Sequence, residues 1–149
     1  MVVAFIGVDN HQRTAKLAIQ IWETLTALLN ESANNFLFNN DNDFDRDCRV
    51  VVSQLKKRHP KIKMHYYQGI FDYDVGYIDW MKEFYDEVYF PPKGIPLKRY
   101  FRNCAMIDKC DVLVTYCTND ELQSEPKSFT AVAIEYALYK KKRVINLFD

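Results

Sequence analysis

The sequence predicts an α/β fold built on a mostly parallel sheet of about five to six strands, in one domain over residues 1–149. Two observations predict it. Short continuous apolar runs, typical of strands buried on both faces, alternate with longer segments of helical period. The strand–helix–strand order requires right-handed crossovers, which place helices on both faces of the sheet. Together they indicate a three-layer, Rossmann-like sandwich.

Each element is predicted by its own pattern. Residues 2–6 are a continuous apolar run that fits a buried strand, whereas residues 62–66 alternate apolar and polar side chains, as in a strand with one more exposed face. His59-Pro60 ends the second helix, because the residue before a proline avoids helical backbone. Strands are predicted at 2–6, 36–38, 62–66, 87–90, 112–116 and 144–148, and helices at 12–30, 43–58, around 78–85, 97–109 and 128–141.

Charge and cysteine content restrict the function. Basic and acidic residues number 20 each, so the formal net charge is zero, whereas nucleic-acid binders usually carry a basic excess. We therefore expect nucleic acid not to be a partner. The four cysteines lack the spacing of zinc ligands, which predicts reduced thiols, no metal and a cytoplasmic protein. No segment resembles a signal or membrane helix, and no cofactor motif occurs, so neither a membrane nor a cofactor is expected.

Candidate site residues come from a rule of geometry. In parallel sheets flanked by helices, ligands bind outside the carboxyl ends of the strands. Gly7 follows the first strand, where a glycine lets backbone approach a ligand closely. Arg102 is either a fork for a phosphate or carboxylate, or a solvated helix arginine. The predicted ligand-binding residues are Gly7, Asp9, Asn39, Asn40, Arg102, Asn103, Ser128 and Thr130.

Several of these residues have a purely structural interpretation as well. Asp9 is either a ligand residue or a helix N-cap, and Asn39 and Asn40 fit a turn equally well. Ser128 and Thr130 carry hydroxyls that either bind an anion at a helix N-terminus or cap the helix. The candidate catalytic carboxylates are Asp9, Asp43 and Glu135.

Four short blocks, together with their spacing, carry a family resemblance: Phe5-Ile6-Gly7, Phe36-Leu37-Phe38-Asn39, Arg102-Asn103 and Ser128-Phe129-Thr130. They resemble the SLOG superfamily, named for the Smf/DprA and LOG proteins, and in particular a branch of small bacterial proteins that opens with Phe-Ile-Gly-His-Arg. The resemblance implies a Rossmann-like fold and nucleotide or nucleotide-derived ligands. In that family the LOG proteins cleave the N-glycosidic bond of nucleoside monophosphates, and others sense ligands or bind nucleic acid.

The chain departs from the family pattern at the expected site. Val8-Asp9 replaces the family's His-Arg, and Asn39 replaces a glycine. Phe129 stands where the family has the central glycine of Ser-Gly-Thr, so its ring is expected to fill part of the pocket. Ala133 occupies the position of the LOG glutamate, which argues against phosphoribohydrolase activity.

Three functions follow from these observations, in this order. The first is a non-catalytic domain that binds or senses a nucleotide-like small molecule at the predicted edge. The second is a protein-interaction module with a decayed pocket, forming a homo-oligomer through the tyrosine-rich segment 66–100. The third is a nucleoside or nucleotide N-glycosidic hydrolase that uses one of the candidate carboxylates.

Overall fold

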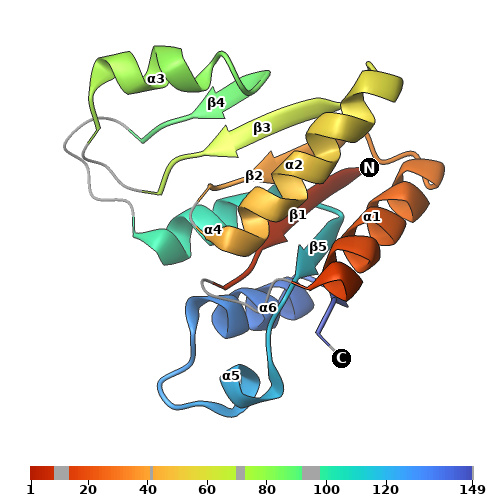
Figure 1. The fold of residues 1–149 in the computed structure, drawn as a ribbon. Coiled ribbons are helices and arrows are strands. Elements are labelled where there is room, and N and C mark those ends of the chain that lie inside the picture. Colours follow the sequence, from red (N-terminus) through yellow and green to blue (C-terminus); the bar gives the residue numbers. More distant parts are fainter. Residues whose placement is uncertain (9–13, 41, 70–72, 92–97, 149) are drawn as a thin grey trace.

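The computed structural model describes residues 1–8, 14–40, 42–69, 73–91 and 98–148. Strands and helices alternate along these residues (Figure 1). The elements are β1 (Val2–Ile6), α1 (Ala15–Asn30), β2 (Asn35–Phe38), α2 (Asp43–Arg58), β3 (Lys63–Tyr67), α3 (Val75–Met81), β4 (Glu87–Tyr89), α4 (Arg99–Lys109), β5 (Val112–Thr115), α5 (Asn119–Gln123), α6 (Phe129–Tyr139) and β6 (Arg143–Asn146). Of the described helices, none is both long and apolar enough to cross a bilayer.

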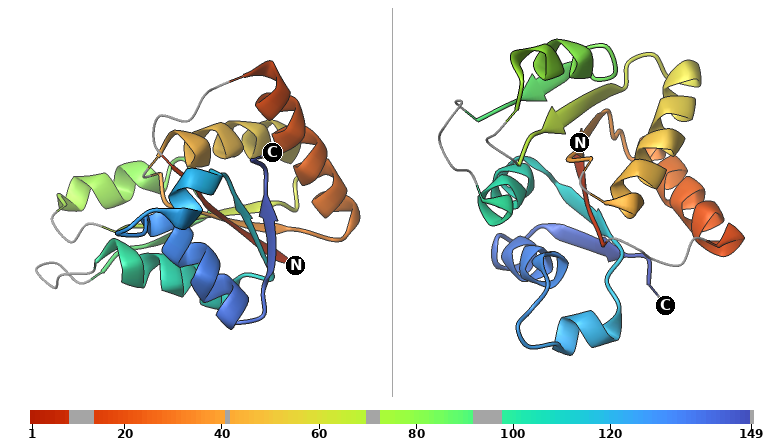
Figure 2. Two further views of the ribbon diagram at one scale, coloured as in Figure 1. Left: turned by 90° about the horizontal axis from the view of Figure 1, so that it is seen from below. Right: turned by 60° about the vertical axis from the view of Figure 1, so that its left-hand side comes forward.

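The strands form one six-stranded sheet in the order β4-β3-β2-β1-β5-β6, and each neighbouring pair is parallel. Helices α1 and α2 cover one face, and α4 and α6 cover the other (Figure 2). This arrangement confirms the predicted α/β class and the three-layer, Rossmann-like sandwich.

The two faces bury unequal cores. On the α1–α2 face, the rings of Phe5 and Phe38 stack with centroids 4.9 Å apart, and both side chains are fully buried. Helix α1 presents to this face a stripe at helical spacing, made of Leu17, Ile21, Leu25 and Leu28. The core under α4 and α6 is smaller and depends on small residues of α6, including Ala133 and Ala137, which let that helix approach the sheet closely.

Helices α3 and α5 differ most from the sequence prediction, whereas the other elements shift by at most a few residues at their ends. Helix α3 spans Val75–Met81 rather than 78–85, because the chain must turn before β4 begins at Glu87. Met81 and Tyr85 both reach the core across that turn. Helix α5 was not predicted, since its five residues carry no apolar periodicity.

The strand order determines where the switch point of the sheet lies. The chain proceeds from β1 to β2 in one direction, and β5 lies on the opposite side of β1. Connections therefore leave the carboxyl ends of β1 and β5 toward opposite faces, and such a switch point opens a crevice between them. Gly7 and Val8 follow β1 at this crevice.

Candidate functional site

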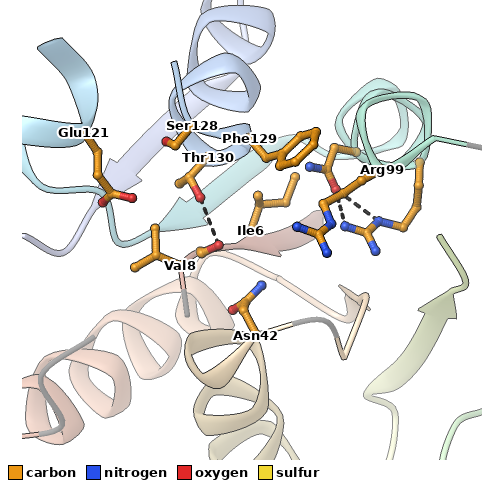
Figure 3. A pocket seen from close by; sticks show the side chains of 11 residues that line it. Ile6, Val8, Asn42, Arg99, Glu121, Ser128, Phe129 and Thr130 are labelled. Carbon is orange, nitrogen blue, oxygen red and sulfur yellow. Dashed lines mark hydrogen bonds between the residues drawn. The ribbon is translucent and has the colours of Figure 1, made fainter. Parts of the chain in front are cut away.

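A cavity of about 220 Å³ lies at this switch point (Figure 3). Its walls come from the end of β1, the turn before α2, and the N-terminal parts of α4, α5 and α6. The lining residues are Ile6, Gly7, Val8, Asn42, Arg99, Arg102, Asn103, Glu121, Ser128, Phe129 and Thr130. Five of the eight predicted ligand-binding residues therefore meet at one cavity: Gly7, Arg102, Asn103, Ser128 and Thr130.

Gly7 has a packing role as well as a place at the cavity. A Cβ atom at this position would lie 2.7 Å from both Cβ and Cγ of Phe44, whose side chain is fully buried. The absence of a side chain thus lets the start of α2 pack on the end of β1. The Gly7 carbonyl accepts a hydrogen bond from Thr130 Oγ1 at 2.9 Å, which ties the first turn of α6 to the same point.

Asn39 and Asn40 belong to the turn between β2 and α2 and do not line the cavity. The Asn39 amide Nδ2 donates to the Phe5 carbonyl at 3.1 Å, which joins this turn to β1. Asn40 adopts a left-handed φ of 54°, a conformation that asparagine tolerates better than most residues. The geometry of the turn accounts for both residues. Their role in ligand binding stays a prediction.

Asp45 holds that turn in place, and sequence reasoning did not select it as a site residue. Its carboxylate is fully buried and accepts the backbone N–H groups of Asn39 at 3.0 Å and Asn40 at 2.8 Å. Asn42 caps α2 by accepting the Asp45 N–H at 2.8 Å. Burial raises the pKa of the Asp45 carboxyl to about 7, although the two N–H groups and the nearby Arg102 charge act to lower it.

Arg102 is a buried cation in the cavity wall, with 3% of its surface exposed. Its Nε and Nη2 donate to Asn103 Oδ1 at 3.1 and 2.8 Å, so the fork is held by its own neighbour. Gly69 lies against it, since a Cβ there would be 2.5 Å from Nη1. The guanidinium is therefore fixed in orientation where it borders the cavity.

The rim carries an aromatic ring and a second cation. Phe129 is 51% exposed, so its ring borders the cavity at the rim and does not fill it as the sequence suggested (Figure 3). The Arg99 guanidinium lies 4.9 Å from the centroid of that ring, within the range of a cation–π contact. Arg99 was missed, although its spacing of three residues from Arg102 on one helix was a usable signal.

The two candidate catalytic carboxylates that the structure describes, Asp43 and Glu135, do not line the cavity. Asp43 begins α2 and forms an ion pair with Arg46 at 3.5 Å, and Glu135 bonds Lys127 on the outer surface of α6. Asp9 lies outside the described residues. Among the described residues, Glu121 contributes a carboxylate to the cavity lining, and its Oε2 accepts the backbone N–H of Thr118 and so caps α5.

Several side chains of the tyrosine-rich segment 66–100 pack into the core. Tyr66, Tyr67 and Tyr85 are buried, and the rings of Tyr66 and Tyr85 lie 5.2 Å apart. Exposed aromatic side chains in this segment include Trp80 and Phe84, at 51% and 50%. Much of the aromatic content is thus explained by packing, and the predicted homo-oligomer stays a prediction.

Comparison with known proteins identifies a structural neighbour. No protein-family model matches the sequence, and no curated protein matches it either. Among solved structures, the chain is similar to DNA processing protein A from Helicobacter pylori, described for its single-stranded DNA binding mode, with a TM-score of 0.59 and 17% identity. The alignment covers 97% of this chain and 63% of that one, so this chain spans less than two thirds of the neighbour's length.

This likeness supports the Rossmann-like fold and contradicts two expectations. A nucleotide-like small molecule was expected as the ligand, and nucleic acid was excluded as a partner; a protein of this fold nevertheless binds single-stranded DNA. The net charge of the whole chain was not a sufficient reason to exclude nucleic acid. At physiological salt, charges more than about 8 Å apart are largely screened, so distant carboxylates do not cancel a local group of cations.

Proposed function

We propose that this chain binds single-stranded nucleic acid at the switch-point cavity, as one SLOG-type domain over residues 1–149 and a divergent member of the Phe-Ile-Gly-His-Arg branch. The fold shared with a single-stranded DNA-binding protein motivates the proposal. The observation that carries it is the rim of the cavity, where the Phe129 ring is half exposed and the Arg99 guanidinium lies 4.9 Å from its centroid.

That pair provides the two interactions that single strands need. An exposed ring stacks on an unpaired base, and a neighbouring cation contacts the backbone phosphate. Arg102 adds a positive charge in the cavity wall, fixed by Asn103. The hydroxyl of Ser128 caps α6 by accepting the Ala131 N–H at 3.1 Å, so that helix begins at the cavity. Its N-terminal N–H groups are positioned to attract an anion.

A single strand fits this site better than a duplex. Bases in a duplex are stacked on each other and expose only their edges, whereas unpaired bases can turn outward onto a protein ring. The site has one accessible aromatic face at its rim, and its cavity of about 220 Å³ is too small to admit a double helix. We therefore expect a preference for single strands that depends little on sequence.

The test is binding of a fluorescein-labelled 12-nucleotide oligothymidylate, followed by fluorescence anisotropy at several salt concentrations. Phe129→Ala is expected to weaken binding about fivefold or more, because base–aromatic stacking contributes at least about 1 kcal/mol. Arg99→Ala is expected to reduce the slope of log K against log salt by about 0.7, the value for one phosphate contact on a single strand.

Matched controls separate this site from general surface effects. Phe84 has nearly the same exposure as Phe129 and lies near β4, so Phe84→Ala should leave affinity unchanged. Arg58 ends α2 at the opposite edge of the sheet and provides the equivalent control for charge. Equal losses from Phe129→Ala and Phe84→Ala, or equal affinity for the oligonucleotide and its duplex, would contradict the proposal.

A further inference from the structure

A second cavity lies on the face of the sheet that α4 and α6 cover only in part. It has a volume of about 330 Å³, within the size range of small-ligand pockets. It is lined by Val2, Asn35, Leu37, His65, Tyr67, Tyr89 and Lys109. Parallel sheets are normally covered on both faces, so ring-bearing side chains around an open cavity over β3 and β4 call for an occupant.

The cavity is built around three aligned rings. Tyr67 and Tyr89 are paired across β3 and β4, and their rings stack with centroids 4.5 Å apart. The His65 ring is nearly parallel to Tyr89, at 6.1 Å, and its Nε2 shares a hydrogen bond of 2.8 Å with Asn35 Oδ1. These contacts fix the orientation of the rings before anything binds.

Two polar groups belong to the residues that line this cavity. The Tyr67 hydroxyl is buried and has no hydrogen-bond partner among the described residues. A buried hydroxyl without a partner is costly, so a movement of the side chain that exposed it to a ligand would be favoured. Lys109 Nζ lies 4.9 Å from the centroid of the Tyr89 ring, which places a cation beside the aromatic surface.

Helix α4 connects this cavity to the switch-point cavity. Arg99 and Arg102 lie in its first turn beside the switch-point cavity, and Lys109 is its last residue. Phe101 is 55% exposed on the outer side of α4, about 80° around the helix from Lys109. Eleven helical residues span about 16 Å, a length that a few nucleotides can cover.

We propose that the open face of β3 and β4 stacks a second base of the same single strand, which reaches it along the flank of α4; this inference rests on the proposed function. The rings and the cation match a base and its phosphate. Asp86 and Glu87 act electrostatically on His65 from the start of β4, so the phosphate path ends at Lys109.

The experiment compares oligothymidylates of 4 and 12 nucleotides on the full chain. The short strand occupies the switch-point cavity, and only the long strand reaches Tyr89. Lys109→Gln and Tyr89→Ala are expected to lower affinity for the long strand about threefold and fivefold or more, respectively, with less than twofold change for the short strand. Lys57→Gln, on the exposed last turn of α2, is the matched control for charge.

A second measurement needs no variant. Photocrosslinking of a long strand with 5-iodouridine at successive positions should label Tyr67 or Tyr89 in the unmodified chain. If both strands bind but neither variant changes their affinity ratio and no label reaches these tyrosines, the inference is wrong while the proposed function stands. If neither strand binds, the proposed function itself fails. A dimer that dissociates on Tyr89→Ala would also overturn the inference, since a second copy would then cover this face.

Discussion

Replacing Gly7 with alanine tests whether the glycine after β1 is required for packing. A Cβ there would lie 2.7 Å from Cβ and Cγ of Phe44, closer than real Cβ atoms come to their neighbours. Gly7 has no left-handed φ, so alanine can adopt its backbone conformation and the cost comes from the contact alone. Overpacking of this kind costs about 1–3 kcal/mol.

A smaller term opposes that cost. Alanine restricts the unfolded chain more than glycine does, which stabilises the folded state by about 0.4–1 kcal/mol where the backbone is compatible. The free energy of unfolding of Gly7→Ala should therefore fall by about 1–2 kcal/mol, with a melting temperature about 2–8 °C lower for a domain of this size. Urea denaturation, with an unchanged m-value, measures this directly.

A double-mutant cycle identifies the contact responsible. Phe44→Ala removes the ring that the new methyl group would meet, and by itself costs about 3–5 kcal/mol because the ring is fully buried. In the double variant, the Gly7→Ala penalty should shrink by at least about 0.5 kcal/mol. Gly76→Ala is the control, since a Cβ there meets nothing within 4 Å. A Gly7→Ala variant as stable as the parent would refute the packing explanation, whereas strictly additive losses would assign the contact to the Cβ of residue 44, which Phe44→Ala keeps, and not to the ring.

Three further predictions concern Asp45, Thr130 and Glu135. Because the pKa of Asp45 is raised to about 7 from 3.8, the folded state keeps a proton between about pH 4 and 7 that the unfolded state has lost. Raising the pH through this window should therefore lower the free energy of unfolding, and urea titrations of Asp45→Asn should lack that component. Thr130→Val removes the hydrogen bond to the Gly7 carbonyl and should cost about 1 kcal/mol in the same assay, unless a water replaces the hydroxyl. Glu135→Gln breaks an exposed ion pair with Lys127, so the melting temperature should change little and oligonucleotide affinity should be unchanged; a clear loss of affinity would mean that Glu135 acts at the site.

The fold could be predicted because its signals are local. The buried strands are continuous apolar runs, and α2 was predicted at its observed bounds because Asp43 opens it and His59-Pro60 ends it. Helix α5 was not predicted because none of its residues is buried, so its sequence shows no apolar periodicity. Its signal was the Thr118-x-x-Glu121 capping box, a pattern set by hydrogen bonds at the first turn rather than by burial.

The position of the cavity was predictable from the sequence, but its lining residues were predictable only in part. The rule for parallel sheets selects the carboxyl edge, and it brought Gly7, Arg102 and Thr130 to one cavity. It could not separate residues that face the cavity from residues that build the turn beside it. Asn39 and Asn40 have the polar character of ligand residues, but their contacts are with the backbone of β1 and with Asp45.

A net charge summed over the whole chain hides the local charge of α4. Helix α4 carries Arg99, Arg102 and Lys109, with Asp108 as its single carboxylate, so this one helix has a net positive charge within a chain of net charge zero. Asp108 accepts a hydrogen bond from the Tyr136 hydroxyl at 2.6 Å and lies 3.8 Å from Lys140 Nζ, which directs its charge toward α6. The flank of α4 that carries Lys109 is left cationic. Because screening confines exposed charges to about 8 Å, the proposed nucleic-acid strand would respond to that flank and not to the total.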